Sequence, residues 1–569
     1  MKKLELSKIL TKNSDKKFYI YIFLAFILSI YFRWDYIGEI SEGHHQWITG
    51  MTLLTIENWM EDGIINDKFL NFQSPDSILY SKNFERYIYT SYPVGSYLII
   101  YPFALLLSQL DVLKVIHYVS LLNHLVIVFF IFYFVKNLKF DLKSKYVESF
   151  AFLASVGYIF VPYAFYYHLI VFQHDTGVIL PFLVILFIEY LIKKKPKKIY
   201  YYSQSLILFL AACIDYFPIA LGIVLIISRS IFTINFKKKV FYLDFLKNSF
   251  QIFIPILIPY LVHFYQIYSI GKLDIIFEKF LMRAGIEGSD KEKFEAVEMI
   301  RSNFIYEFWV KKFNIYLPIL VFILSYLALS LRKSIKQNLE CYILLLGFLA
   351  CILYSYLLRG YASQHDFAVL KFIPLIIISL FSVIPLKLLT LTKNRKNYFY
   401  FINFISFKKL FIIFSLSFFL LVCIDNFIRI SWIKTKSNPY VNLDNKKMYS
   451  YFWLSQFPDT GIGNYNLLKK IRSVSNFNDV YFSFGRFETG IIPPQALSIS
   501  RKIVKRIENQ KDLINQINYL SNLANINIII DKKNKCSKLF NYNYKKFFVD
   551  DWIIIKINKR DFEKIKVCF

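Results

Sequence analysis

Acids and imidazoles gather just after the first long apolar segment of the chain. Glu39, Glu42, His44 and His45 lie close together there, and the stretch from Gly43 to about Met60 has a helical pattern. A carboxylate that is partly removed from water can act as a general base, because burial raises its affinity for a proton. A solvated loop with histidines at a membrane interface would have the same composition, so these residues alone leave both interpretations open.

The tripeptide Gln-His-Asp occurs twice, each time just before an apolar segment, and a lysine follows the second copy where that segment begins. An aspartate at the start of a helix accepts backbone N–H bonds, so helix capping alone explains the two acids. Capping does not explain a histidine in both places. The candidate site residues from these two segments are His174, Asp175, His365, Asp366 and Lys371.

The composition is that of a membrane protein. Hydrophobic residues make up 56% of the chain and aromatic residues 19%, and the long apolar runs contain few charges. The formal net charge of +29 comes largely from lysines in short connecting segments. Such segments anchor a protein beside anionic lipid, so we expect membrane lipid and no nucleic acid among the partners. The preference for Lys, Ile, Phe, Tyr and Asn suggests an AT-rich, bacterial genome.

Segments of about 17–25 apolar residues are long enough to cross the hydrocarbon core of a bilayer. Two regions are ambiguous: Pro93–Leu110 is either a span or a helix on the surface, and Leu206–Ser230 is either one span or a hairpin of two. The clear candidates are Phe18–Trp34, Val115–Val135, Tyr146–Tyr167, Gly177–Ile192, Phe250–Ile270, Phe313–Leu331, Cys341–Leu358, Lys371–Leu389 and Lys409–Ile430.

The lysine clusters decide between these alternatives, because basic connecting segments stay on the cytoplasmic side. If Pro93–Leu110 crossed the bilayer, the clusters at 136–145 and 193–198 would lie outside, whereas a surface helix leaves both inside. The cluster at 237–239 is then inside only if Leu206–Ser230 crosses twice. The predicted fold is a polytopic all-α membrane protein of about eleven transmembrane helices, with the N-terminus inside and the C-terminus outside.

This topology predicts two domains and places the candidate residues on the outer face. Residues 1–430 would form the transmembrane domain, with a long first outer loop at 35–114. Residues 431–569 would form a small extracytoplasmic α/β domain, in which Cys536 and Cys568 could pair. The elements expected in this domain are helices at Tyr465–Val474 and Ser500–Leu523 and strands at Val480–Phe484, Ile526–Ile530 and Trp552–Ile557. The break in the hairpin would place Asp215 near the outer surface, where a carboxylate is more easily hydrated.

At these residues the chain resembles the GT-C class of membrane glycosyltransferases, whose members include protein O-mannosyltransferases and the lipid A aminoarabinose transferase. In that family the first span leads to a long outer loop with an acidic motif, often Asp-Glu before an aromatic residue. Glu42 matches the catalytic carboxylate of that motif. The first acid is missing, because Ser41 stands at its place, and Glu39 and Asp35 are the neighbouring substitutes.

Three further motifs carry the resemblance, which covers roughly Phe18 to Ile430. Tyr92-Pro93-Val94 resembles the start of a surface helix in the family's first loop, with Val94 in place of a second proline. Asp175 matches an acid in the second outer loop. The segment from His365 to Lys371 loosely matches a later outer motif that precedes a proline-containing span.

The resemblance implies an inverting sugar transfer on the extracytoplasmic face of the cell membrane. The donor would be a polyprenyl-phosphate sugar and the acceptor a hydroxyl of a glycan, lipid or protein. Glu42 would accept the proton of that hydroxyl as its oxygen attacks the anomeric carbon, with Asp175 and Glu39 as the other catalytic candidates. The departing phosphate needs positive charge beside it, and Lys371 is the preferred source because of its position. The implied substrate-binding residues are His44, His45, Tyr92, His174, Arg359, His365, Asp366 and Lys371.

No cofactor is expected with certainty. Glu42, His44, His174 and Asp175 would make a donor set for a divalent metal, but their spacing matches no strong metal signature, so we name no metal ligands. The alternative function is a polytopic transporter or flippase for a lipid-linked sugar or a small solute. Carriers place charged groups near mid-membrane, whereas here His263 is the main polar candidate well inside a span.

Overall fold

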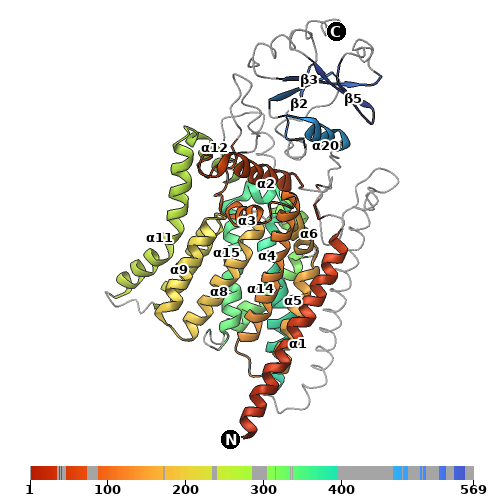
Figure 1. Cartoon of the computed structure of the whole chain (residues 1–569). Coiled ribbons are helices and arrows are strands. Elements are labelled where there is room, and N and C mark those ends of the chain that lie inside the picture. Colours follow the sequence, from red (N-terminus) through yellow and green to blue (C-terminus); the bar gives the residue numbers. More distant parts are fainter. Residues whose placement is uncertain are drawn as a thin grey trace. The chain divides into compact units, whose positions relative to one another are not determined.

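The chain is mostly helical, with one small sheet near its C-terminus (Figure 1). The computed structural model describes residues 2–34, 37–38, 40, 46–72, 88–170, 174–233, 240–284, 304–313, 316–332, 335, 337–393, 465–476, 478–484, 500–502, 504–507, 525–533 and 544–557. The predicted span Lys409–Ile430, the cysteines Cys536 and Cys568, and the predicted domain boundary at residue 430 lie outside these residues. These three predictions stay predictions.

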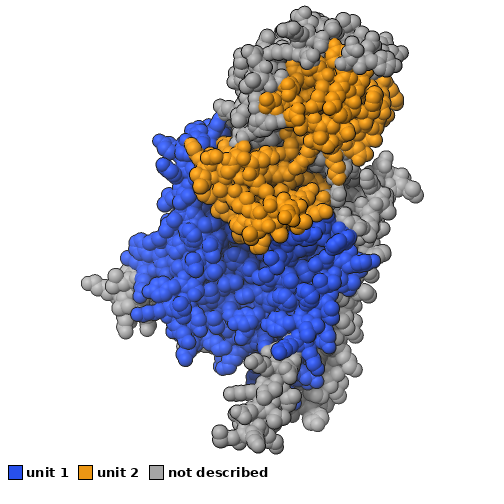
Figure 2. All heavy atoms as spheres, in the orientation of Figure 1, with its two compact units in different colours: residues 1–37, 91–96, 117–456 blue, residues 38–90, 97–116, 457–569 orange. Residues whose placement is uncertain are grey.

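The chain divides into two compact units, shown in two colours in Figure 2. Unit 1 consists of Met1–Ile37, Ser91–Ser96 and His117–Gln456. Unit 2 consists of Gly38–Thr90, Tyr97–Ile116 and Phe457–Phe569. The long first loop therefore contributes to both units, and most of it belongs with the C-terminal region.

The apolar segments form helices because backbone groups that lie in lipid must find their hydrogen-bond partners within the segment itself. The helices that lie in unit 1, or mostly so, are α1 (Lys2–Arg33), α4 (Val112–Asn137), α5 (Ser144–Phe160), α6 (Pro162–Ile170), α7 (His174–Gly177), α8 (Ile179–Lys194), α9 (Lys198–Ala212), α10 (Phe217–Thr233), α11 (Val240–Tyr268), α12 (Leu273–Ala284), η4 (Ile305–Lys312), α14 (Tyr316–Leu331), α15 (Leu339–Leu357), α16 (Arg359–Gln364), η5 (Asp366–Lys371), α17 (Ile373–Ile378), η6 (Ser379–Val383) and α18 (Ile384–Lys393).

Among the described residues, five helices are long and apolar enough to cross a membrane, or up to seven if each of two bent pairs is one span. The bent pairs are Ser144–Phe160 with Pro162–Leu169, at 57°, and Ile305–Lys312 with Tyr316–Leu331, at 93°. This supports a multi-pass membrane protein. The predicted total of about eleven spans stays a prediction.

The two regions that were ambiguous in the sequence form short helices. The first contains α3 (Gly95–Leu106), whose 12 residues extend over about 18 Å, well short of a hydrocarbon core of about 30 Å. The second contains α9 and α10, which contact each other and are separated by a break around Asp215. The predicted hairpin of two helices is confirmed, and its crossing of the membrane stays a prediction.

Gly95 at the start of α3 allows the backbone there to approach the break after α9. Its N–H donates to the carbonyl oxygen of Cys213 at 2.8 Å, and an added Cβ would lie 2.3 Å from that same oxygen. We expect Gly95→Ala to lower the free energy of unfolding by at least about 1–3 kcal/mol, because neither backbone can yield without losing the hydrogen bond. Thermal unfolding in detergent measures the change. Gly177→Ala is the control, since its Cβ would meet side-chain carbons alone, a methyl group of Ile214 at 3.3 Å and the Cβ of Ser96 at 3.8 Å. An equal loss in both variants would contradict the prediction.

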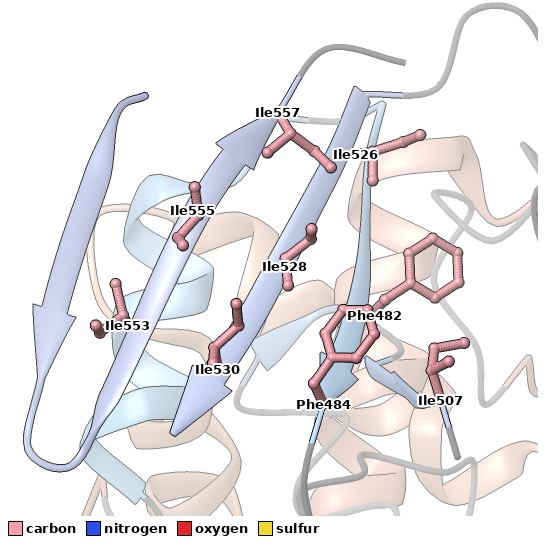
Figure 3. Packing of buried hydrophobic residues seen from close by; sticks show 9 residues of the cluster. All are labelled: Phe482, Phe484, Ile507, Ile526, Ile528, Ile530, Ile553, Ile555 and Ile557. Atoms are coloured by element: carbon pink, nitrogen blue, oxygen red, sulfur yellow. The ribbon is translucent and has the colours of Figure 1, made fainter. Parts of the chain in front are cut away.

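Unit 2 contains a five-stranded mixed sheet of order β2-β1-β3-β5-β4. Its strands are β1 (Asp479–Phe484), β2 (Val504–Arg506), β3 (Asn525–Asp531), β4 (Lys546–Val549) and β5 (Trp552–Ile557). Strand β1 pairs in parallel with β2 and β3, and β5 pairs antiparallel with β3 and β4. Alternate residues point to one face, where isoleucines of β3 and β5 pack against Phe482 and Phe484 (Figure 3).

The structure confirms most elements expected near the C-terminus and corrects one. Helix α20 (Tyr465–Val474) and strands β1, β3 and β5 stand at the predicted places. The prediction of a helix at Ser500–Leu523 is wrong near its N-terminal end, because Val504–Arg506 forms strand β2. Val504 lies opposite Tyr481 in the parallel pairing with β1, so a partner distant in the sequence overrides the helical pattern.

Within unit 2, ion pairs connect the first loop to the C-terminal region. Helix α2 (Gln46–Asn58) and the π-helix η2 (Trp59–Gly63) provide Glu57 and Glu61. Arg472 Nη2 lies 2.6 Å from Glu57 Oε1, and Arg501 pairs with both Glu57 and Glu61. Although burial alone lowers the pKa of the Arg472 guanidinium, the Glu57 carboxylate raises that pKa above its ordinary value. These contacts tie together segments more than 400 residues apart in the sequence.

Candidate active site

A lysine held between two aspartates is the most strongly buried charged cluster that the candidate residues form. Lys371 Nζ lies 2.5 Å from Asp175 Oδ1 and 3.0 Å from Asp215 Oδ2. The side chains of Lys371 and Asp215 are 0% exposed and that of Asp175 is 2% exposed. The cluster carries a net charge of −1 when all three groups are ionised, because one ammonium faces two carboxylates.

Tyrosine hydroxyls complete the hydrogen bonds of the two carboxylates. Tyr361 Oη donates to Asp175 Oδ2, and Tyr354 Oη donates to Asp215 Oδ1 at 2.8 Å. The backbone N–H of Phe217 donates to the same Asp215 oxygen at 3.0 Å. Lys371 Nζ also lies 4.6 Å from the centre of the Tyr354 ring. Each charge therefore has a partner, which is the condition for keeping ions inside a protein.

Helix ends and breaks position the cluster. Asp175 lies in the short helix α7 ahead of α8, Asp215 in the break between α9 and α10, and Lys371 at the end of η5. Backbone groups at such ends lack partners within the helix, so polar side chains gather there. Asp215 is not hydrated, because it is completely buried and Lys371 compensates its charge. Its predicted place near the outer surface stays a prediction.

An arginine and two tyrosines, whose rings meet edge to face, lie next to this cluster. The Arg283 guanidinium carbon is 4.4 Å from the ring centre of Tyr92 and 5.5 Å from that of Tyr361. Arg283 Nη1 donates to the carbonyl oxygen of Ser91 at 3.4 Å, and its side chain is half-buried. Because Tyr361 also binds Asp175, the guanidinium and the buried cluster share one aromatic residue.

Arg359 lies at the junction between α16 and the end of α12. Its Nε donates to the carbonyl oxygen of Ala284 at 3.1 Å. The following residue must be small, since a Cβ on Gly360 would lie 2.5 Å from the carbonyl oxygen of Met282. This close approach places the backbone of Arg359 beside that of Arg283, so two arginines occur in one small region.

The structure brings together some of the predicted site residues. Asp175 and Lys371 are in direct contact, and Tyr92 and His365 join them through Tyr361, whose ring centre lies 6.1 Å and 5.0 Å from theirs. The backbones of His174 and Asp366 are described but their side chains are not, and Glu39, Glu42, His44 and His45 lie outside the described residues. The roles given to all of these residues stay predictions.

Sequence reasoning missed Arg283 and did not place Asp215 in the site. Arg283 ends an amphipathic helix in a charged segment, and nothing in the sequence distinguishes it from the other basic residues there. The only signal for Asp215 is an acid at the break of an otherwise apolar hairpin.

The described residues do not fit a divalent metal. They contain no group of three or more His, Cys, Asp or Glu side chains that could hold one. The two carboxylates that do converge, Asp175 and Asp215, already bind the ammonium of Lys371, which a cation would have to displace.

Comparison with solved structures finds similarity along nearly the whole chain. ArnT from Cupriavidus metallidurans bound to undecaprenyl phosphate has a TM-score of 0.51 at 10% identity, over 95% of this chain and 97% of that one. The Archaeoglobus fulgidus oligosaccharyltransferase in the apo form has a TM-score of 0.48 at 11% identity, over 91% of this chain and 70% of that one. No protein-family model and no curated protein sequence matches the chain.

Proposed function

We propose that this chain, whose fold is that of the GT-C class of membrane glycosyltransferases, transfers a sugar from a polyprenyl-phosphate donor to an acceptor hydroxyl. The observation that carries the proposal is the similarity to ArnT over 95% of the chain. That ArnT structure is bound to undecaprenyl phosphate, which would be the leaving group of such a donor. The buried charges of Asp175, Asp215 and Lys371 beside Arg283 support the proposal, because ionisable residues inside a membrane bundle are costly and mark functional sites.

The donor phosphate requires positive charge when the bond between the sugar and its oxygen breaks. The bonding electrons stay with that oxygen, so the phosphate leaves with an additional negative charge. Guanidinium groups suit this task, since they present several N–H donors in one plane and can bind a phosphate in bidentate fashion. We assign phosphate binding to Arg283 and Arg359.

Lys371 takes a different role from the one preferred from its position. Its ammonium is completely buried and engaged by two carboxylates, so we assign it to holding Asp175 and Asp215 in place. Tyr92 likewise positions the Arg283 guanidinium on its ring face. His365, which is half-buried and whose ring is tilted against that of Tyr361, stays a candidate for contact with the substrate.

The acceptor hydroxyl must lose a proton as its oxygen forms the new bond to the anomeric carbon. We assign this proton to Glu42, with Glu39 as its neighbour, on the extracytoplasmic side of the membrane. Attack from the side opposite the departing phosphate inverts the configuration at the anomeric carbon. His44 and His45 lie close enough in the sequence to contact the acceptor or the sugar.

Replacing Arg283 with Gln is expected to lower kcat/KM for the lipid donor about 10- to 100-fold. The charge-assisted hydrogen bonds of a guanidinium to an anion contribute about 1.5–3 kcal/mol, and they strengthen as the leaving phosphate gains its additional negative charge. Steady-state kinetics with varied donor measure the effect. Arg332→Gln is the matched control, because Arg332 is exposed after α14, outside the site. An unchanged kcat/KM in Arg283→Gln would remove this residue from phosphate binding.

The test of the proposal compares donor classes. Purified full-length protein receives one labelled sugar on a polyprenyl phosphate or on a nucleotide, each with and without a metal chelator. We expect transfer to an acceptor from the lipid donor alone. Transfer from the nucleotide sugar alone would show that the donor assignment is wrong.

A carrier for a lipid-linked sugar is the second candidate. The observation that favours it is the same buried cluster, because transporters also keep paired charges inside their helix bundles. His263 in α11 is buried as well.

A further inference from the structure

A large cavity with several charged residues in its lining lies among connecting segments of unit 1 that the sequence predicts to be cytoplasmic. Its volume is about 730 Å³. Residues after α4, at the end of α8, before α15 and in α18 line it together. The charged residues of its lining are Lys139, Asp141, Lys193, Lys194, Glu340 and Lys387. Two segments that the lysine pattern assigned to the cytoplasmic side, 136–145 and 193–198, thus meet at one place.

This cavity is separate from the candidate active site. The apolar helical segment Asp175–Lys194 has 20 residues and therefore extends over about 30 Å. Asp175 of the buried cluster stands at its first residue and Lys194 of the cavity at its last. Helix α15 repeats this arrangement, with Glu340 in its first turn and Tyr354 near its end. The cavity and the cluster accordingly lie at opposite ends of the helix bundle.

The lysines of the cavity differ in whether their ammonium groups already form ion pairs with neighbouring acids. Lys387 pairs with Glu340 and donates to Asn338 Oδ1 at 3.0 Å, and Lys193 Nζ lies 3.9 Å from Glu189 Oε1. Lys139 and Lys194 are exposed, and neither ammonium forms an ion pair within the described part of the chain. The lining has four lysines and two acids, so its formal charge is +2.

We propose that this cavity binds a phosphate-bearing anion, and that its ligand is the headgroup of an anionic phospholipid in the adjoining leaflet. Lys139 and Lys194 supply the positive charge. Phe140, Ile335 and Leu339 are half-buried apolar lining residues, which suits a ligand whose polar head continues into an apolar chain. The volume falls within the range of about 300–1,000 Å³ typical of ligand pockets, and basic pockets between transmembrane helices bind lipid phosphates.

The test measures lipid binding by the full-length protein in nanodiscs, with phosphatidylglycerol as the anionic probe and phosphatidylcholine as the neutral one. We expect the double variant Lys139→Gln with Lys194→Gln to weaken phosphatidylglycerol binding about 30-fold, since each lysine near a lipid surface contributes about 1 kcal/mol. Arg at both positions should preserve binding. The matched control is Lys143→Gln with Lys145→Gln, which removes two exposed lysines of the same connecting region that do not line the cavity.

A parallel experiment adds inorganic phosphate to identify the source of the anion. We expect no displacement of phosphatidylglycerol by millimolar phosphate; displacement would overturn the lipid assignment in favour of a soluble phosphate compound. An equal loss of phosphatidylglycerol binding in the control variant, Lys143→Gln with Lys145→Gln, would overturn the proposal. It would show that the lipid responds to the general surface charge and not to a site. Equal binding of the two lipids by the unmodified protein would overturn it as well. Neither measurement involves sugar transfer, so its result is independent of the proposed function.

Discussion

Replacing Glu42 with Gln is expected to lower the rate of sugar transfer by about 10²–10⁴, which would reduce it to background in most assays. The amide keeps the shape of the carboxylate but cannot accept the proton of the acceptor hydroxyl. The step that forms the new bond would then leave a positive charge on the attacking oxygen. Initial rates at saturating donor and acceptor measure the effect, because a base acts on kcat.

The same experiment needs a control variant at another glutamate and a check that the Glu42→Gln protein is folded. Glu278→Gln makes the same chemical change at an exposed position of α12, so we expect it to retain full activity. The Glu42→Gln protein should insert into the membrane and elute from size exclusion like the unmodified protein. Full activity in Glu42→Gln would take the role of base away from this residue, and Glu39→Gln would then be the next variant to measure.

Replacing Lys371 with Met is expected to lower the free energy of unfolding by about 3–5 kcal/mol. The change removes the ammonium and leaves the carboxylates of Asp175 and Asp215 facing each other with almost no exposure to water. Each then carries an uncompensated charge in a medium that solvates charge poorly. Denaturant unfolding in mixed detergent micelles measures the loss.

Two further variants separate this mechanism from a general effect of losing a lysine. Lys311 Nζ forms a partly exposed ion pair with Glu307 at 2.6 Å. Lys311→Met should therefore lower the free energy of unfolding by less than about 1 kcal/mol. Adding Asp175→Asn and Asp215→Asn to Lys371→Met should recover part of the lost stability, because it removes the two negative charges. If Lys371→Met lost no more stability than Lys311→Met, the result would contradict the account of the buried cluster.

The pattern of lysines and apolar segments predicts much of the helical framework. It predicts a hairpin of two helices around Asp215, which the structure contains. It also leads us to keep Pro93–Leu110 out of the membrane, which stays a prediction. Both predictions rest on the tendency of basic connecting segments to stay on the cytoplasmic side, a rule that acts along the sequence. Such a rule needs no knowledge of which helices touch.

The contacts of the candidate site depend on tertiary packing, which is why the sequence predicts them only in part. Asp175 and Lys371 could be singled out because each lies at the edge of an apolar segment, yet 196 positions separate them and their contact could not be read from the chain. Arg283 becomes notable only when Tyr92 and Tyr361 are placed against it. The strand at Val504–Arg506 was missed for the same reason, since its partner β1 lies elsewhere in the sequence.

The most direct test of the central claim asks whether the protein performs chemistry on a lipid-linked sugar or only moves it. Full-length protein is reconstituted into sealed liposomes with a polyprenyl-phosphate sugar labelled in the sugar and in the lipid. We predict that free polyprenyl phosphate appears in a one-to-one ratio with sugar bound to the acceptor. Donor that changes leaflet while its bond between sugar and phosphate stays intact would contradict the account.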